Sequence, residues 1–141
     1  MDTTELPLEF GNAGDVPTNG TGWFVGFSEW TRDGLGLRHL PHDVASTGLC
    51  IKWFFHTDGH PHGEVKPLSA GRTISVLVGD AGGFRLDFSR SSGFEPERTV
   101  TRVLRRSGDF AIWGEEIYHR AWSVETSCIL TVRWLPAAPE R

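Results

Sequence analysis

The sequence predicts an all-β domain, on three observations. Its strongest apolar runs are short and rich in β-branched and aromatic residues, as in Leu49–His56. Seventeen glycines and eight prolines are scattered along the chain, where they can supply the turns between strands. No segment keeps a helical period over several turns. Short strands separated by turns about every eight to twelve residues are typical of a β-sandwich or a β-barrel.

The strands follow one another with few gaps after residue 49. A glycine-rich turn, Gly79–Gly83, separates two apolar runs and predicts that they pair as a hairpin. In chain order, the expected strands are Trp23–Phe27, Leu35–Leu40, Leu49–His56, Thr73–Val78, Phe84–Phe88, Thr99–Leu104, Phe110–Trp113, Tyr118–Val124 and Cys128–Trp134.

The length of 141 residues fits one domain. Residues 1–20 are polar and without a period, so we expect a loose N-terminal leader. Residues 21–135 are expected to form the barrel, and residues 136–141, with their prolines, an exposed C-terminal tail.

Composition excludes some classes of partner. The net charge of -4 argues against a nucleic-acid-binding surface, which needs a basic stripe. No apolar stretch is long enough to span a bilayer, and the acidic first residues do not resemble a secretory signal. We therefore expect a cytoplasmic protein that binds neither nucleic acid nor membrane, with Cys50 and Cys128 reduced.

Histidine is the residue type that points to chemistry. Three of the six histidines, His56, His60 and His62, lie within seven residues, and Glu64 follows. In an extended backbone His60, His62 and Glu64 project to one side, which would make a partial shell for Zn²⁺, Fe²⁺, Mn²⁺ or Ni²⁺. His119, at the start of a later strand, is the candidate to complete it. The alternative is a solvated polar turn.

Two segments resemble the motifs of the cupin superfamily, and specifically a short single-domain cupin. Residues 108–119, with Gly-Asp, a short strand, a glycine turn and then His119, resemble the second cupin motif. The histidine-rich segment and the strand that ends Val76-Leu77-Val78-Gly79 resemble the first. The resemblance covers residues 49–134. It implies a double-stranded β-helix (a jelly-roll-like barrel) with a divalent transition metal held inside by histidines and a glutamate.

The first motif departs from the pattern, since Arg72 stands where the glutamate is expected. Two registers follow. In one, His60 and His62 are the paired ligands and Glu64 replaces the lost carboxylate. In the other, His56 faces His119 and residues 60–64 form a rim loop. The second resembles short cupins with Lys-Trp-x-x-His (residues 52–56) and Thr-Val-Arg-Trp (residues 131–134). Some cupins have lost ligands and hold no metal, so both alternatives stay open.

Charged residues within the predicted strands suggest how a ligand is bound. Lys52 shares a strand face with His56, and a buried ammonium group needs an acidic partner or an anionic ligand. We hypothesise that Lys52 or Arg133 binds a carboxylate of a small substrate. A structural ion pair or an outward-facing charge is the alternative. Trp113 and Trp122 flank the His119 turn and are expected at the mouth of a pocket.

These observations leave three functions open. The first is a metal-dependent enzyme of isomerase, cyclase, dehydratase or dioxygenase type that acts on a small, carboxylate-bearing metabolite. The second is a metal-free cupin in which His119 or His56 is a general acid or base, with Tyr118 or Glu116 as its partner. The third is a non-catalytic cupin that binds a small molecule. The resemblance also implies a homodimer paired through edge strands.

Overall fold

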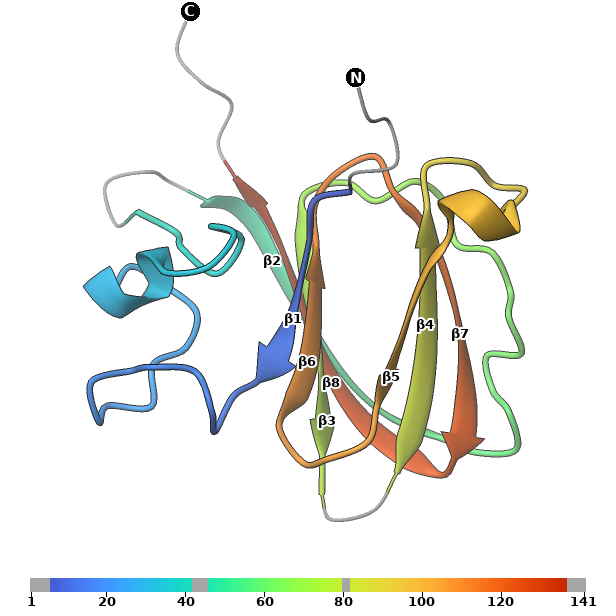
Figure 1. The fold of residues 1–141 in the computed structure, drawn as a ribbon, viewed down its shortest axis with the longest axis horizontal. Helices are drawn as coiled ribbons and strands as arrows, with labels where there is room; N and C mark the ends of the chain where they lie inside the picture. The colour runs from blue at the N-terminus through green and yellow to red at the C-terminus, as the bar shows by residue number, and fades with distance from the viewer. Residues whose placement is uncertain (1–5, 42–45, 80–81, 137–141) are drawn as a thin grey trace, which may run out of the picture.

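The computed structural model describes residues 6–41, 46–79 and 82–136, and these form two antiparallel sheets that face one another (Figure 1). The larger sheet has the strand order β1-β6-β3-β8-β2, and the smaller has the order β5-β4-β7. In chain order the strands are β1 (Leu8–Asn12), β2 (Ser46–His56), β3 (Arg72–Val78), β4 (Gly83–Ser89), β5 (Val100–Leu104), β6 (Asp109–Trp113), β7 (Tyr118–Glu125) and β8 (Ser127–Pro136). Two short 3-10 helices, Glu29–Arg32 and Pro96–Arg98, lie in the connections.

The connection between β2 and β3 completes the smaller sheet although its backbone is irregular. It runs antiparallel to β7, where Gly63 N donates to Ala121 O (2.8 Å) and Ser69 N to Ile117 O (3.0 Å). Figure 1 shows this segment in light green beside β7. From β2 onward the chain therefore passes repeatedly between the two sheets. This is the double-stranded β-helix, or jelly roll, so the predicted all-β fold class is confirmed.

Gly63 shows why this connection can lie so close to β7. Its φ is +72°, and a Cβ at this position would overlap the Trp122 ring. Only glycine combines the left-handed backbone with the missing side chain that this approach requires.

The predicted hairpin across Gly79–Gly83 is wrong. β3 pairs with β6 and β8 in the larger sheet, whereas β4 pairs with β5 and β7 in the smaller one. Turn composition marks where a strand ends but does not say in which sheet the next strand pairs. The apolar faces of β3 and β4 can be buried equally well across the barrel interior.

Three predictions for the N-terminal region are also wrong. Residues 8–12 lie in the predicted loose leader, yet they form β1, which pairs with β6. Residues 23–27 and 35–40 form no strand, and only an isolated bridge joins Gly26 to His39. Apolar residues of this region pack onto the barrel from a loop. The apolar composition of the two predicted strands therefore reflects contact with the barrel and not strand structure. Residues 1–5 and 137–141, the ends of the predicted leader and tail, lie outside the described residues.

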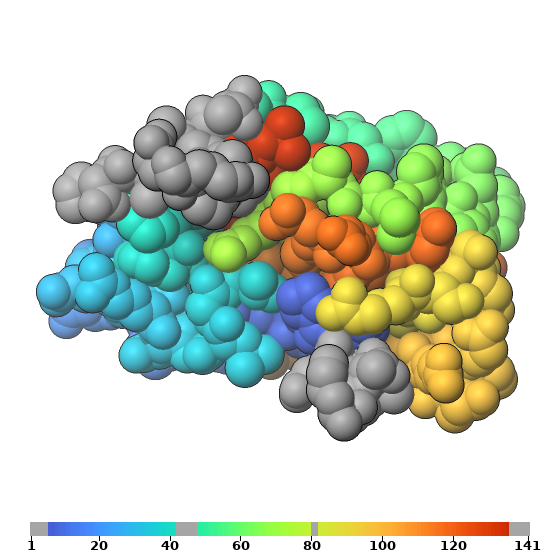
Figure 2. Space-filling view, turned by 90° about the horizontal axis from the view of Figure 1, so that it is seen from above, coloured from blue at the N-terminus to red at the C-terminus, as the bar shows by residue number. Residues whose placement is uncertain are grey.

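Two apolar clusters divide the interior. The first lies between the two sheets and includes Leu77, Phe88 and Trp113. The second lies on the outer side of the larger sheet, where the segment between β1 and β2 packs against Ile112 and Trp134. Figure 2 shows this segment, in blue to cyan, on one flank of the molecule. The larger sheet is thus buried on both faces where the segment covers it.

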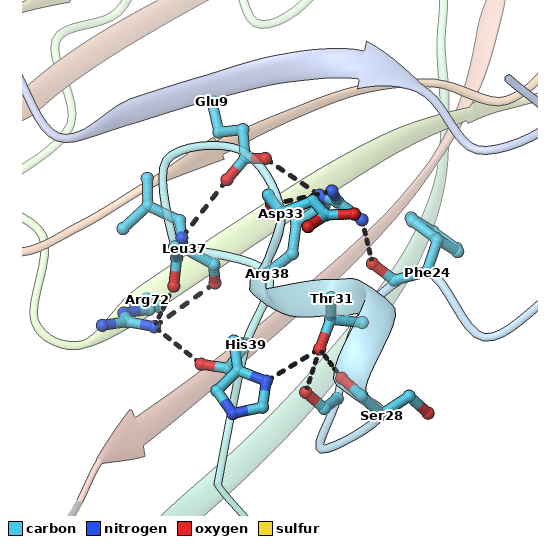
Figure 3. A network of polar contacts seen from close by, with 11 residues as sticks. Glu9, Phe24, Ser28, Thr31, Asp33, Leu37, Arg38, His39 and Arg72 are labelled. Carbon is cyan, nitrogen blue, oxygen red and sulfur yellow. Dashed lines mark hydrogen bonds and ion pairs between the residues drawn. The ribbon is translucent and has the colours of Figure 1, made fainter. Parts of the chain in front are cut away.

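A buried ion pair fixes the N-terminal segment to β1. Arg38 is 3% exposed and its Nε donates to Glu9 Oε2 at 2.9 Å (Figure 3). The two terminal nitrogens of the Arg38 guanidinium donate to Phe24 O and Asp33 O. Glu9 Oε1 accepts a hydrogen bond from the backbone N–H of Leu37. Each charge of the Arg38–Glu9 pair is thus compensated, and the polar atoms of both side chains have hydrogen-bond partners, as a buried ion pair requires.

Arg72 fastens the same segment from β3. Its guanidinium donates to the carbonyls of Gly36, Leu37 and His39 (Figure 3). The side chain therefore lies on the outer face of the sheet and holds the loop, which accounts for an arginine where the first cupin motif would have a glutamate. Among the described residues no helix is long and apolar enough to cross a membrane.

We predict that Arg38→Met lowers the free energy of unfolding by about 3–5 kcal/mol, because it leaves the Glu9 carboxylate buried without its partner. Denaturant unfolding followed by tryptophan fluorescence measures this. The control is Arg106→Met, since the exposed Arg106–Asp15 pair (3.4 Å) should contribute less than about 1 kcal/mol. Equal effects of the two substitutions would show that the buried pair does not hold the segment.

Candidate functional site

A cavity of about 60 Å³ lies inside the barrel between the two sheets. It is large enough for a few water molecules or the charged end of a small ligand. Side chains from both sheets and from the 57–71 connection line it: Lys52, His56, Pro61, Lys66, Ser75, Phe84, Leu86, Trp113, His119, Ala121, Ile129, Thr131 and Arg133. Two histidines from strands distant in the sequence therefore share one cavity.

His56 reaches the cavity because strand alternation places it on the inner face of β2. Lys52 is on the same face, and their partners across β8 are Ser127 and Thr131. The His56 side chain is buried, and its Nδ1 lies 2.9 Å from Nδ1 of His60. One of these nitrogens donates and the other accepts. This leaves Nε2 as the nitrogen of His56 that can serve a ligand.

His119 enters from the opposite sheet, on the inner face of β7. Its ring packs against the buried Trp113 at 4.8 Å between centroids. Nδ1 of His119 is buried, and no atom of the described residues forms a hydrogen bond with it. Nε1 of Trp113 is in the same situation. Buried polar atoms without partners are rare in folded proteins. Of the four in the described residues, these two belong to residues that line the cavity, whereas Ser123 Oγ and Trp134 Nε1 do not.

The charge of the cavity is positive. Lys52, Lys66 and Arg133 line it, and no aspartate or glutamate is among the lining residues. Lys66 forms an ion pair with Glu64 at 3.0 Å, at the exposed rim. Arg133 donates from Nε to Thr73 Oγ1 (2.8 Å). Within residues 6–41, 46–79 and 82–136, neither Lys52 nor Arg133 has a carboxylate within ion-pair distance.

This environment keeps both imidazoles neutral at pH 7. The pKa of His119 is lowered to about 3, first by burial and then by the charges of Arg133, Lys66 and Lys52. The pKa of His56 is lowered to about 4, by burial, His60 and Lys52. Burial, Lys66 and Arg133 also lower the pKa of Lys52. The protonated, charged form of each of these three groups is destabilised in the cavity. A nearby anion would therefore stabilise all three charged forms.

The residues of the cavity do not fit a divalent metal. His56 and His119 are the only two metal-ligand side chains that line it, and no described group of three His, Cys, Asp or Glu could hold an ion. Typical sites supply three or four such ligands. The three cationic side chains would also repel Zn²⁺ or Fe²⁺. The lining is therefore poor in metal ligands and rich in cationic side chains.

Several residues that the sequence suggests for the site lie elsewhere. His62 and Glu64 are exposed at the rim, and His60 reaches the cavity only through His56. The first register, with His60, His62 and Glu64 as a ligand set, therefore does not describe this cavity. The geometry follows the second, in which His56 and His119 share a cavity behind a rim loop.

Tyr118 and Trp122 lie on the outer face of β7. Since His119 and Ala121 line the cavity, strand alternation turns their even-numbered neighbours outward. Trp122 packs beneath the Arg85 guanidinium, at 4.7 Å from its ring centroid, rather than at the pocket mouth. The expected roles of Tyr118 as partner of His119 and of Trp122 in substrate binding are not compatible with this placement.

Sequence reasoning missed Lys66, Ser75 and Thr131. Ser75 Oγ and Thr131 Oγ1 are hydrogen-bonded at 2.8 Å in the wall of the cavity. A signal for both existed, since each is a polar residue between apolar neighbours in a predicted strand. For Lys66 the local sequence carried no such signal, because it lies in an irregular connection.

Only solved structures gave matches when the chain was compared with known proteins. No protein-family model matches the chain, and no curated protein matches it. Among solved structures, the hydroxypropylphosphonic acid epoxidase from S. wedmorenis is similar, with a TM-score of 0.47 and 12% identity over 60% of this chain and 42% of that one. An iron(II) form of HppE in complex with substrate gives a TM-score of 0.44 and 9% identity, over 60% of this chain and 44% of that one.

The WlaRB TDP-quinovose 3,4-ketoisomerase from Campylobacter jejuni gives a TM-score of 0.41 and 13% identity, over 64% of each chain. This chain thus spans less than half the length of the first two structures. The strand pairing decides the architecture by itself, because from β2 onward the chain crosses repeatedly between the larger sheet, which holds β2, β3, β6 and β8, and the smaller sheet, which holds β4, β5 and β7. The described strands therefore form an all-β jelly roll, the fold class that the sequence resemblance implies.

We predict that nuclear magnetic resonance titration finds the imidazoles of His119 and His56 neutral at pH 5.5, since their pKa values are about 3 and about 4. Lys52→Met should raise both pKa values, because it removes a nearby positive charge. Arg105→Met, which removes a charge from the exposed turn after β5, should leave them unchanged. A midpoint near the ordinary value of about 6.5 for either ring would contradict the electrostatics described here.

Proposed function

We propose that this cupin binds a small carboxylate-bearing metabolite inside its barrel, and that His56 and His119 transfer protons to and from it without a metal. One observation carries the proposal: two neutral imidazoles and three cationic side chains line a single cavity, and none of the lining residues is acidic. An anionic ligand would supply the missing countercharge.

Lys52 and Arg133 are the groups proposed to bind the carboxylate. They come from the paired strands β2 and β8, which fixes their spacing. Arg133 is held by its hydrogen bond to Thr73, so part of its conformational entropy is already lost before a ligand binds. Hydrogen bonds to charged groups are worth roughly 1.5–3 kcal/mol each, enough to orient a small molecule.

The imidazoles are proposed to act as general bases once the anion is bound. Their low pKa values in the unliganded cavity result in part from the charges of Lys52, Lys66 and Arg133. A bound carboxylate neutralises that field and raises both pKa values toward neutrality, where an imidazole is an effective base. A C–H bond next to a carbonyl of the ligand breaks, the imidazole takes the proton, and the electron pair remains as an enolate opposite Lys52 and Arg133. Return of the proton to a different atom completes an isomerisation.

A non-catalytic binding protein is the second candidate, because the same cations would bind a carboxylate whether or not the imidazoles react. A metal-dependent reaction, such as that of a dioxygenase, would need ligands that this cavity lacks among its described residues. The iron(II) of HppE, one of the similar structures, is a property of that protein.

We predict saturable binding of small carboxylates, with acetate, oxalate and pyruvate as probes and inorganic phosphate as the competing anion. Chemical shifts of the Trp113 indole and the His119 ring report it. Lys52→Met and Arg133→Met should each weaken binding at least about tenfold, or ~1.4 kcal/mol. Binding should strengthen from pH 7 to pH 5.5, because the anion raises the imidazole pKa values and the complex takes up protons.

The control is again Arg105→Met, which should bind like the wild type. Unchanged affinity in both Lys52→Met and Arg133→Met would refute the anion site. Preference for phosphate over every carboxylate would refute the proposed ligand class while leaving the cation cluster as an anion site.

We predict that the wild type accelerates deuterium exchange at the methyl group of bound pyruvate in D₂O, and that His119→Gln reduces this rate at least about 100-fold, the usual contribution of a general base. The exchange is followed by proton resonance, and elemental analysis of the same chelator-free sample should find no stoichiometric transition metal. Binding without exchange would favour the non-catalytic candidate. A stoichiometric metal that His56→Ala and His119→Ala both lose would overturn the metal-free assignment.

A further inference from the structure

A cleft of about 270 Å³ opens at the free edges of the two sheets, on the side of the barrel opposite to β2. β1 is the edge of the larger sheet farthest from β2, and β5 is an edge of the smaller sheet among the described strands. Residues of β1, β5, β6 and the turns beside them line the cleft, and they are all different from the described residues that line the barrel cavity. We call this space the edge cleft and define it by Phe10, Arg102, Leu104, Arg106 and Phe110.

Arg102 reaches the edge cleft from the inner face of β5. Its cross-strand partner on β4 is Leu86, which lines the barrel cavity. Strand alternation places the buried Leu104 on the same face of β5 as Arg102. The guanidinium carbon of Arg102 lies 4.4 Å from the ring centroid of Phe10 on β1. A strand of the smaller sheet and a strand of the larger sheet thus meet at their open edges through a cation–aromatic contact.

Arg102 is the cation of the edge cleft whose charge no carboxylate compensates within residues 6–41, 46–79 and 82–136. Two aspartates also line the cleft, but both have other partners. Asp109 accepts hydrogen bonds from Asn12 Nδ2 (2.8 Å) and from two backbone N–H groups of the turn after β5. Asp15 forms an exposed ion pair with Arg106 at 3.4 Å. The positive charge that remains available to a ligand is therefore that of Arg102.

The walls beside Arg102 are apolar. Phe10, Leu104 and Phe110 line the edge cleft, and the last two are each 1% exposed. An inward-pointing charge on an edge strand can by itself discourage pairing with another chain. That role requires no space next to the charge, whereas here the charge faces a cleft with room for a small molecule. A cation beside apolar walls matches a ligand with an apolar body and one anionic group.

We propose that the edge cleft binds a small aromatic carboxylate, with the ring of the ligand against the apolar walls and its carboxylate on Arg102. An engineered cavity of roughly 150 Å³ holds benzene, so the edge cleft has room for one ring and its carboxylate. The barrel cavity, at about 60 Å³, does not.

The contact with Phe10 prepares Arg102 for this ligand. Stacking uses the flat face of a guanidinium group and leaves the N–H groups of its edge free. Two parallel N–H···O bonds from that edge fit the two oxygens of a carboxylate. The site does not depend on the proposed function, since it uses none of the residues that line the barrel cavity.

Titration with benzoate, followed by the chemical shifts of the Arg102 Nε–H and the Phe10 ring, should show saturable binding. Benzamide, which has the same shape without the charge, should bind at least about tenfold more weakly to the wild type. Arg102→Gln should weaken benzoate binding by a similar factor, because it removes the charge and keeps a polar side chain. The matched control is Arg105→Gln, which removes an exposed arginine of the neighbouring turn outside the cleft lining and should bind benzoate like the wild type.

Two further measurements separate the edge cleft from the barrel cavity. Lys52→Met should leave the affinity for benzoate unchanged, and Arg102→Gln should leave unchanged any shift that acetate causes at the His119 ring. Loss of benzoate binding in Lys52→Met would overturn the proposal, because the ligand would then occupy the barrel cavity.

Absence of a saturable shift at Arg102 up to about 10 mM benzoate would also overturn it. Equal affinities for benzoate and benzamide would have the same consequence, since the guanidinium would then bind no charge. This comparison uses only the wild type, so it decides the question even if Arg102→Gln does not fold.

Discussion

Lys52 and Arg133 lie on the inner face of a β-barrel with no carboxylate of the described residues within ion-pair distance, and much of the arrangement follows from this charge. The cations that line this cavity contribute to the lowered pKa values of Lys52, His56 and His119, and they would repel a metal ion. They are also the reason why we propose an anion as the ligand. The two imidazoles that a metal-binding cupin would use as ligands are therefore left as neutral groups in a positive field, and their basicity depends on the charge of what binds.

Around the cavity the inner face of the larger sheet is polar, although an apolar cluster fills the rest of the space between the sheets. Where Lys52, Thr131 and Ser75 occupy the inner face, the apolar residues of β2, β8 and β3 are turned outward. An apolar outer face needs a cover. The segment between β1 and β2 provides part of it, fixed by the buried Glu9–Arg38 pair and by Arg72. On β2 the outward side chains of Leu49, Ile51, Trp53 and Phe55 are exposed. The polar side chains of the cavity and the exposed apolar side chains of β2 thus follow from one alternating strand pattern.

Local sequence located most strands well, because alternation and turn residues act over a few positions. From β2 onward every expected strand exists, within a few residues of its predicted ends. The predicted hairpin of β3 and β4 is wrong because strand pairing depends on where the apolar face of each strand can be buried. The residues of the turn carry no information about that. The N-terminal region failed for a related reason. Trp23 to Leu40 has strand-like composition, but it packs as a loop against a surface formed by strands much later in the chain.

The sequence by itself determined the β-rich class, the resemblance to cupins, and the faces on which Lys52 and His56 stand, since alternation is a property of each strand alone. It could also have excluded Tyr118, which as the neighbour of His119 must face the other way. Only the tertiary structure decided that His56, rather than His60 or His62, shares a cavity with His119, and that Glu64 remains at the exposed rim. The reason is physical: the site is assembled from two sheets and a connection, and the distance between side chains on separate strands depends on how the sheets close over one another.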